Sequence, residues 1–383
     1  MLGILFASQR NNWGHGPTSS IQKIHEGPIP RIGGLAIVLG TWFSILCIHD
    51  SSTFFTNLVA SLQQNPFASP LLSAQPPTSL GQRAASFVNP FILQTFMAST
   101  CTFIVGFLED VTGTLPVRSR LLLTFIPGMA LSLYTGIGLT HLGIPGVDTL
   151  LAYPTLAILF TGFALAGLAH AFNIVDGLNG LVSYMTLWIL GAYLVLAVLY
   201  DDPLIAKTCL LLITPVLGFL FFNWPSAKCF LGDGGAYFLG FMAAWIGVAL
   251  VARHSQLSAF APALICAYPI AETLFSIGRR MHKKQSSGDP DREHLHQLFV
   301  FGVIEPYFAG RSQGAISSVS MQANSIAGLI ISLLPIPCMV LTWFYSANQA
   351  VLVAGIIGTC LAYYSLYRYA LRAYYRYHAS QTL

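Results

Sequence analysis

The sequence predicts an all-α protein, a polytopic bundle of transmembrane helices. Of its 383 residues, 55% are hydrophobic and only 8% are charged, whereas a soluble domain carries about 25% charged residues. Apolar windows of about 17–25 residues, long enough to span a bilayer as helix, recur about ten times. These windows are continuously apolar rather than alternating, which is not the pattern of a transmembrane β-barrel.

The expected spans follow one another along the whole chain, with no soluble module between them. In order they cover residues 32–48, 87–108, 119–140, 151–170, 181–200, 204–222, 236–252, 258–278, 325–344 and 349–370. We therefore expect one membrane domain, residues 1–383, with an outer loop at 49–86 and an inner loop at 279–323. The stretch MLGILFAS is too short to span, so we expect that a first helix is missing from this chain.

Basic residues favour cytoplasmic loops, and they orient this chain with both ends in the cytoplasm. In that orientation only Arg83, Lys207 and Arg253, of eighteen Lys and Arg residues, lie outside. The net charge of +4 then reflects membrane topology and requires no nucleic-acid partner. None of the seven cysteines forms a CxxC pair, which argues against a disulfide framework or a zinc site.

Acidic residues gather at the cytoplasmic ends of the expected spans. They are Glu109, Asp110, Asp176, Asp233, Asp291 and Glu293. Carboxylates at the membrane boundary are costly and usually functional. Because neighbouring carboxylates repel one another, several on one face suggest a metal or cation site.

Asp233 stands among glycines in FLGDGG. Gly232, Gly234 and Gly235 permit close backbone approach to a bulky ligand, and a carboxylate with phosphate oxygens and water suits Mg²⁺. A tight helix-to-helix turn with an exposed Asp is the alternative interpretation of this motif.

The segment NIVDGLNGL repeats polar residues at a spacing of three. Asn173, Asp176 and Asn179 would share one face of a helical turn, where they suit the edge of a base or a ribose. Helix caps are the alternative, since Asp and Asn before Gly commonly begin or end helices.

Two adjacent acids end the motif GFLED. On a helix Glu109 and Asp110 point about 100° apart, so one of them is expected to face a site. Asp110 could act as general base or orient a metal-bound water. An interfacial anchor paired with Arg118 or Arg120 is the alternative.

Basic and histidine-rich segments lie near the same face. In DREHLHQLF, Arg292, His294 and His296 could grip a diphosphate, or could form a solvated basic loop near anionic lipid. Lys23 and Arg31 of KIHEGPIPRIGG could touch phosphate or could anchor the chain at the membrane surface. Glu272 could pair with Arg279 or line a cavity.

Taken together, these motifs give the chain a family resemblance. It resembles the polyprenyl-phosphate N-acetylhexosamine-1-phosphate transferases, the glycosyltransferase 4 family, and most of all its undecaprenyl-phosphate N-acetylglucosamine-1-phosphate transferases. The resemblance rests, in family order over about residues 21–300, on HEGPIPRIGG, GFLED, NIVDGLNGL, FNWPSAKCFLGDGG and DREHLHQL.

The resemblance implies a fold, a location and a reaction. It implies about eleven spans in the bacterial inner membrane, with an active-site cleft open to the cytoplasm, and Mg²⁺, for which Mn²⁺ could substitute. The implied substrates are undecaprenyl phosphate and a UDP-N-acetylhexosamine; the products are a lipid diphosphate sugar and UMP. Such a step initiates a cell-envelope polysaccharide, as in O-antigen, lipopolysaccharide or cell-wall biogenesis. A homodimer is compatible with it.

The resemblance also implies roles for matched residues. Asp233 is the expected metal ligand, and Glu109 and Asp110 are the expected catalytic acid pair. His294 and His296 are expected to act in the reaction, while the implied substrate-binding residues are Asn173, Asp176, Asn179, Asn223, Arg292, Lys23 and Arg31. The chain departs from the family where Glu109 replaces Asp, Asn179 replaces a frequent Asp, and Ala236 replaces a frequent Ser.

The sequence leaves other functions open. An ion- or proton-coupled transporter would use the same acids, though transporters favour midplane positions on broken helices. An inactive family member is suggested by Glu109. For the transferase, a one-step displacement and a two-step route through an aspartyl intermediate are both possible. The donor sugar and the polymer pathway stay undetermined.

Overall fold

The computed structural model describes residues 29–47, 89–284, 293–308 and 320–381. These residues form helices and no strand, and seven of the helices are long and apolar enough to cross a membrane. The predicted polytopic helical bundle is thereby confirmed. Lys23, Arg292, the outer loop 49–86 and residues 285–292 and 309–319 of the inner loop 279–323 lie outside the described residues.

The helices follow the apolar windows of the sequence, with ends displaced by a few residues. The long ones are α5 (Pro90–Thr112), α6 (Val117–Thr135), α8 (Pro154–Val175), α9 (Leu181–Leu199), α10 (Pro203–Asn223), α11 (Gly232–Arg253) and α17 (Gln349–Gln381). The shorter ones are α2 (Gly33–Cys47), α7 (Val147–Leu151), α12 (Phe260–Ile265), α13 (Ala267–His282), α14 (Leu295–Phe299), η2 (Val300–Ile304), η3 (Glu305–Tyr307), α15 (Met321–Ser332) and α16 (Ile336–Tyr345).

By length and composition, the ten expected spans are reduced to seven among the described residues. Helix α2 has only 15 residues. Helix α6 carries Arg118 and Arg120 in its first turn, which makes it less apolar than the windows around it. The window 258–278 is interrupted at Cys266, which separates α12 from α13. Helices α15 and α16 together provide one crossing, Met321–Tyr345.

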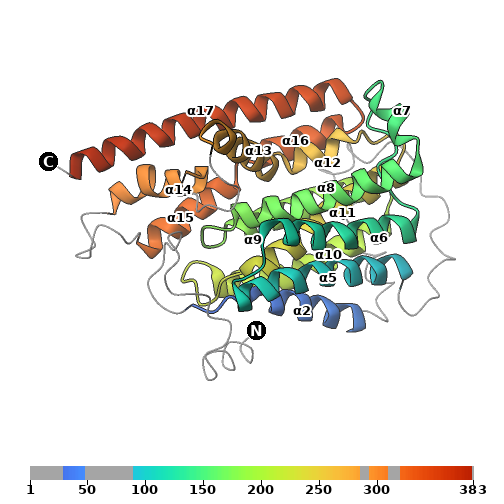
Figure 1. Ribbon diagram of the computed structural model, residues 1–383, viewed down its shortest axis with the longest axis horizontal. Helices are drawn as coiled ribbons and strands as arrows, with labels where there is room; N and C mark the ends of the chain where they lie inside the picture. Colours follow the sequence, from blue (N-terminus) through green and yellow to red (C-terminus); the bar gives the residue numbers. More distant parts are fainter. Residues whose placement is uncertain (1–28, 48–88, 285–292, 309–319, 382–383) are drawn as a thin grey trace, which may run out of the picture.

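Helix α11 lies inside the bundle and packs against α2, α5, α8 and α9 (Figure 1). Nearly all of its residues are buried. Small residues permit this packing, because they let membrane helices approach closely: a Cβ on Gly240 would stand 2.7 Å from the Ala169 Cα of α8. Trp245 Nε1 donates a hydrogen bond to Thr95 Oγ1 of α5 at 2.8 Å.

Consecutive long helices run in opposite directions, so the bundle has two ends. At the first end α10 begins and α11 finishes, and Asp202 binds Arg253 and His254 there. At the second end α5, α8 and α10 finish while α6, α9 and α11 begin, and we call it the site end. The acids that the sequence analysis singled out lie at the site end wherever the structure describes them.

Candidate active site

The turn between α5 and α6 separates the two adjacent acids. Glu109 Oε2 accepts a hydrogen bond from the Leu115 backbone N–H at 2.7 Å, and Oε1 lies 3.7 Å from Arg120 Nη1. Asp110 instead is buried and points at the start of α11, where its Oδ2 accepts from the Gly234 backbone N–H at 3.1 Å. Glu109 therefore supports the turn, and Asp110 faces the neighbouring helix.

Asp233 occupies the first turn of α11, and glycines bring the backbone around it close to α5. Gly232 has a φ of 78°, a left-handed conformation that favours glycine. A Cβ on Gly106 of α5 would stand 2.5 Å from the Asp233 carbonyl carbon. The Asp233 carboxylate is partly exposed and accepts a hydrogen bond from Arg120 Nη1 at 2.9 Å. Asp110 and Asp233 are thus held on adjoining turns of two packed helices.

The segment before α2 lies along the chain that leads into α11. The Phe230 backbone N–H donates to the Pro30 carbonyl, and the Gly33 N–H donates to the Phe230 carbonyl, each at 2.9 Å. Gly34 N–H bonds the Leu231 carbonyl at the same distance. This backbone pairing places Arg31 Nη1 3.8 Å from Asp110 Oδ1. Residues 30–34, the described end of the motif HEGPIPRIGG, and the motif FLGDGG, about two hundred residues further along the chain, therefore form one wall of the site.

Asp176 and Asn173 come from the end of α8, opposite the start of α11. Asn173 interacts with the Tyr237 hydroxyl of α11. Burial raises the pKa of Asp176 to about 7, and the negative charge of Asp233 adds to this effect, while the positive charge of Arg31 opposes it. Asp176 therefore lies within electrostatic range of Asp233 and Arg31.

Asn179 and Asn223 hold loops together at the site end. The Asn179 side-chain amide donates to Ser325 Oγ at 3.1 Å, and its backbone N–H donates to Asn324 Oδ1 at 2.7 Å. Asn223 accepts from the Gly180 N–H at 2.6 Å and donates to the Cys229 carbonyl at 2.9 Å. Both side chains are buried. Their polar groups therefore tie α9, α10 and α15 together, although the sequence analysis assigned them to substrate.

The histidines are fixed by a buried acid. Glu272 of α13 is fully buried; it accepts a hydrogen bond from the Tyr363 hydroxyl at 2.9 Å and lies 2.9 Å from His294 Nδ1. His294 and His296 have nearly parallel rings with centroids 5.5 Å apart. His296 packs directly against Gly177, the residue after Asp176. Glu272 thus pairs with His294, not with Arg279 as one interpretation of the sequence expected.

Arg120 is a site residue that the sequence analysis treated only as an anchor. It bonds Asp233, and it lies near Glu109 and the His170 ring of α8. The signal was present in GFLEDVTGTLPVRSR, where VRSR follows the acid pair after six residues. What the sequence could not show is that an arginine in α6 faces the first turn of α11, because that depends on how the two helices pack.

The described side chains suit a divalent cation. Four carboxylates, of Glu109, Asp110, Asp176 and Asp233, stand near two guanidinium groups, of Arg31 and Arg120. Asp110 Oδ1 is buried and has no hydrogen-bond partner among the residues that the structure describes. Within the described ranges no group of three or more His, Cys, Asp or Glu side chains surrounds a single point, but Mg²⁺ usually takes one or two carboxylates and completes its shell with water and substrate phosphates.

The fold and the site define a multi-pass membrane protein with a cluster of acids at one end of its helical bundle. Residues 92–251, which carry Asp110, Asp176 and Asp233, match glycosyl transferase family 4. Over this stretch the chain is similar to that family.

Several curated proteins are also similar to the chain. The chain is 28% identical over 289 residues to a Bacillus subtilis (strain 168) protein named "Probable undecaprenyl-phosphate N-acetylglucosaminyl 1-phosphate transferase", covering 74% of this chain and 69% of the relative. It is 25% identical over 314 residues to "Undecaprenyl-phosphate alpha-N-acetylglucosaminyl 1-phosphate transferase" of Yersinia pestis, covering 81% and 74%. It is 33% identical over 156 residues to "Phospho-N-acetylmuramoyl-pentapeptide-transferase" of Bacillus cytotoxicus, covering 38% and 48%.

Proposed function

We propose that this protein is a polyprenyl-phosphate sugar-phosphate transferase, which moves an N-acetylhexosamine-1-phosphate from a UDP-sugar to undecaprenyl phosphate. The observation that supports it best is the convergence of Asp110, Asp176 and Asp233, from three separate parts of the chain, at one end of a membrane bundle. The names of the relatives support the same lipid acceptor.

The reaction is a single displacement at phosphorus. An oxygen of the lipid phosphate bonds to the β-phosphorus of the UDP-sugar, and the bond from that phosphorus to the bridging oxygen breaks. UMP leaves with the bond's electrons, and the products are the lipid diphosphate sugar and UMP. The second pKa of a phosphate monoester is near 6, so the attacking group is already largely dianionic at neutral pH and needs positioning more than deprotonation.

The chain's own groups hold these two anions in reach of one another. Arg31 and Arg120 provide fixed positive charge beside Asp110 and Asp233, and guanidinium forks bind phosphate oxygens in pairs. The buried Oδ1 of Asp110 is left to orient the acceptor or its bound cation. Asp176 and Asn173 face the same space from α8 and suit the nucleotide.

Mg²⁺ would be held by Asp233, with Asp110 beside it, and would supply positive charge that neutralises the diphosphate and the leaving UMP. It would also offset the excess of carboxylates over guanidinium groups. In this proposal the site opens toward the cytoplasm of a bacterial inner membrane, where UDP-sugars are available.

The arrangement favours an enzyme over a transporter. The acids lie at the ends of α5, α8 and the start of α11, whereas coupled transporters place such groups at the midplane of broken helices. Glu109, which stands where the family usually has Asp, accepts a hydrogen bond from Leu115 and lies near Arg120. Because this residue supports the turn, the change from Asp to Glu is compatible with an active enzyme.

The test uses the full chain purified in detergent with undecaprenyl phosphate, a UDP-N-acetylhexosamine and Mg²⁺. Asp233→Ala should lose UMP release and lipid diphosphate sugar, measured by product mass, with normal expression. Asp148→Asn is the matched control, because Asp148 lies at the other end of the bundle and bonds His141 and the Leu142 N–H. Wild-type turnover by Asp233→Ala, or UMP release that does not depend on lipid phosphate, would contradict the proposal.

A further inference from the structure

Helix α17 is longer than a membrane crossing requires. Its 33 residues extend about 50 Å at 1.5 Å per residue, whereas the hydrocarbon core is about 30 Å thick. Gln349, its first residue, bonds the Gly143 carbonyl at the end opposite the site. The helix therefore reaches the other membrane boundary near Arg368, and its remainder continues past the ends of α8, α9 and α11 (Figure 1).

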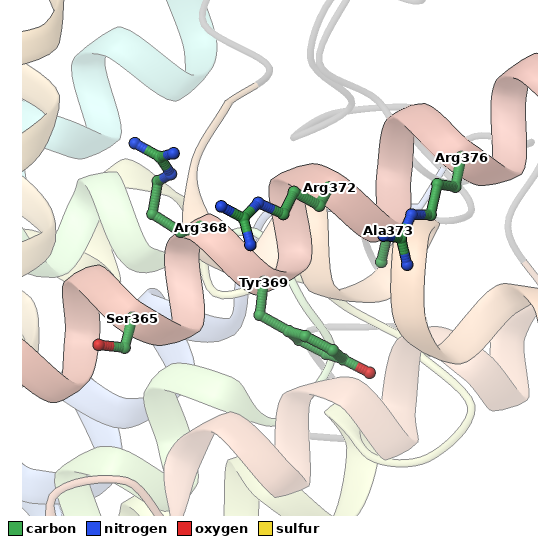
Figure 2. Close-up of a pocket in the computed structure, with 6 residues that line it drawn as sticks. All are labelled: Ser365, Arg368, Tyr369, Arg372, Ala373 and Arg376. Atoms are coloured by element: carbon green, nitrogen blue, oxygen red, sulfur yellow. The ribbon is translucent and has the colours of Figure 1, made fainter.

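One face of this remainder carries a row of arginines. Arg368, Arg372 and Arg376 recur at a spacing of four, which places them on one face of a helix. All three are exposed. With Ser365, Tyr369 and Ala373 they line a surface cavity of about 300 Å³ (Figure 2). We call Arg368, Arg372 and Arg376 the arginine row.

The opposite face of the same segment is occupied by the protein. Tyr363 bonds Glu272, and Tyr367 accepts a hydrogen bond from Arg279 at 3.3 Å. Further along, a Cβ on Gly302 would stand 2.5 Å from the Tyr374 backbone nitrogen, so η2 packs directly against α17. The helix is therefore held in place, and the arginine row faces away from the bundle.

Within the part of the chain that the structure describes, no acid balances the charge of the arginine row. No carboxylate among the described residues lies within 4.0 Å of the row, and none of its members forms a salt bridge. Arg368 Nη1 donates to the Tyr364 hydroxyl at 3.0 Å, and the guanidinium stacks 5.8 Å from that ring. Like charges four residues apart on a helix repel, so an external anion would stabilise the row. Guanidinium groups match phosphate in shape.

The surface of α17 next to the arginine row is apolar, which suits an anion that carries an apolar part. Leu361 and Ile357 precede Arg368 by two and three turns on the same side of α17, and they are 62% and 55% exposed. Exposed Tyr369 and Tyr375 flank the row, as aromatic residues do at the membrane interface. The arginine row suits a phosphate group, and the exposed side chains of Leu361 and Ile357 suit an acyl chain. Together they match the two parts of a phospholipid.

We propose that this face of α17 binds an anionic phospholipid of the leaflet at the site end, with its phosphate on the arginine row and an acyl chain along Leu361 and Ile357. Zwitterionic lipid fits less well, because its ammonium group would meet three uncompensated guanidinium groups. Among the described residues, the contacts of the arginine row do not include the acids of the candidate active site, and this proposal does not rest on the proposed reaction.

The test titrates phosphatidylglycerol onto the full chain in a neutral detergent and counts protein-bound lipid by native mass spectrometry. A triple Arg368→Gln, Arg372→Gln, Arg376→Gln variant should bind it about 100-fold more weakly, since each arginine near an anionic surface is worth about fivefold. The matched control, Arg118→Gln with Lys228→Gln, removes exposed charges from the same end and should stay within twofold of the wild type.

Three results would overturn the assignment. They are equal binding by the triple variant and the wild type, binding of phosphatidylcholine as tight as phosphatidylglycerol, and binding of inorganic phosphate as tight as the lipid. The last would identify free phosphate as the ligand. Because no sugar substrate is present, these results do not depend on whether the chain is a transferase; UMP release, measured separately, tests that.

Discussion

At the scale of single residues, the two adjacent acids at the end of α5 have different roles because their side chains point in different directions. Asp110 is 6% exposed and accepts from the Gly234 N–H across to α11. Glu109, one residue earlier, turns back to the α5–α6 loop and accepts from Leu115. A rotation of about 100° per residue separates these directions. The chemistry and the support of the turn are therefore carried by different side chains.

Asp110→Asn removes charge while keeping an oxygen for the Gly234 N–H. We expect kcat to fall about 100-fold or more, because the loss of a preorganised charged group at a reacting centre typically costs that much, while KM for the UDP-sugar changes little. Glu109→Gln should lower kcat much less and mainly lower the unfolding temperature. Steady-state kinetics of both variants provides the check; an equal loss of kcat in the two would contradict this division of roles.

Glu272 makes a second residue-scale prediction. Glu272→Gln replaces an acceptor-only group that meets the Tyr363 hydroxyl, the Leu295 N–H and His294, so one donor is left facing another. Loss of buried hydrogen bonds costs about 1–3 kcal/mol, and turnover should fall as His294 and His296 lose their placement. Tyr363→Phe, which removes only one donor, should cost less. Thermal unfolding of both variants decides; a larger effect from Tyr363→Phe would contradict the prediction.

At the scale of elements, the packing of α11 decides where the site lies. Three helices converge on its first turn: α5 at Gly106, α2 at Gly34, and α6 through Arg120. Gly34 and Gly235 meet backbone to backbone. Any larger side chain at these contacts would push an acid away from its partners, so the glycines of FLGDGG act as packing residues as well as a ligand surface.

Gly106→Ala tests this packing. Its Cβ would stand 2.5 Å from the Asp233 carbonyl carbon, so α5 and α11 must separate; we expect lower stability by about 1–3 kcal/mol and a loss of turnover. Gly167→Ala is the matched control within α8, since its Cβ would meet nothing within 4 Å, and Ala is the better helix former. The unfolding temperature in detergent and the rate of UMP release are measured for Gly106→Ala and for Gly167→Ala. Similar behaviour of both variants would rule out the close approach as the cause.

At the scale of the whole molecule, the two ends of the bundle differ in how their polar groups are paired. The site end carries the acids and leaves charge unbalanced. The other end pairs Asp202 with Arg253 at 2.5 Å and with His254 at 2.9 Å, and Tyr200 bonds Ser346 Oγ at 2.7 Å. Polar groups that are satisfied internally rigidify a structure, so this end is expected to hold the helices while the site end binds ligands.

The pH dependence of stability tests the contribution of the Asp202 ion pairs at this end. Although burial opposes it, hydrogen bonds from His254 and Arg253 and the Arg253 charge lower the pKa of Asp202 to about 2. Because the folded-state pKa lies below the ordinary value, the stabilisation is present above about pH 4 and is lost as pH falls toward 2, by up to about 2 kcal/mol. Unfolding of the wild type between pH 5 and 2.5 should show this loss, and Asp202→Asn should remove that part of it. Parallel curves for the two proteins would contradict the assignment.

Much of the site could be predicted because its polar residues stand out in an apolar chain. Asp110, Asp176 and Asp233 were found this way, and the structure places them at one end. The hydrogen bonds of Asn179 and Asn223 to neighbouring loops could not be predicted, because an amide in a motif looks the same whether it binds a ligand or a loop. The partner of Glu272 was not predictable either, since His294 lies 22 residues away and meets it only after α13 and α14 pack.

The sequence alone determined that this protein is a helical membrane bundle. Long apolar windows enter lipid as helices, and the distribution of basic residues orients them, and both are properties of the sequence itself. It also determined which residues are candidates for chemistry, because each charge near a membrane is costly and therefore conspicuous. The tertiary structure decided which of them meet: that Asp110 faces α11 while Glu109 does not, and that Arg120 reaches Asp233. Those contacts depend on helix rotation and on glycine-mediated approach between distant segments, which only packing sets.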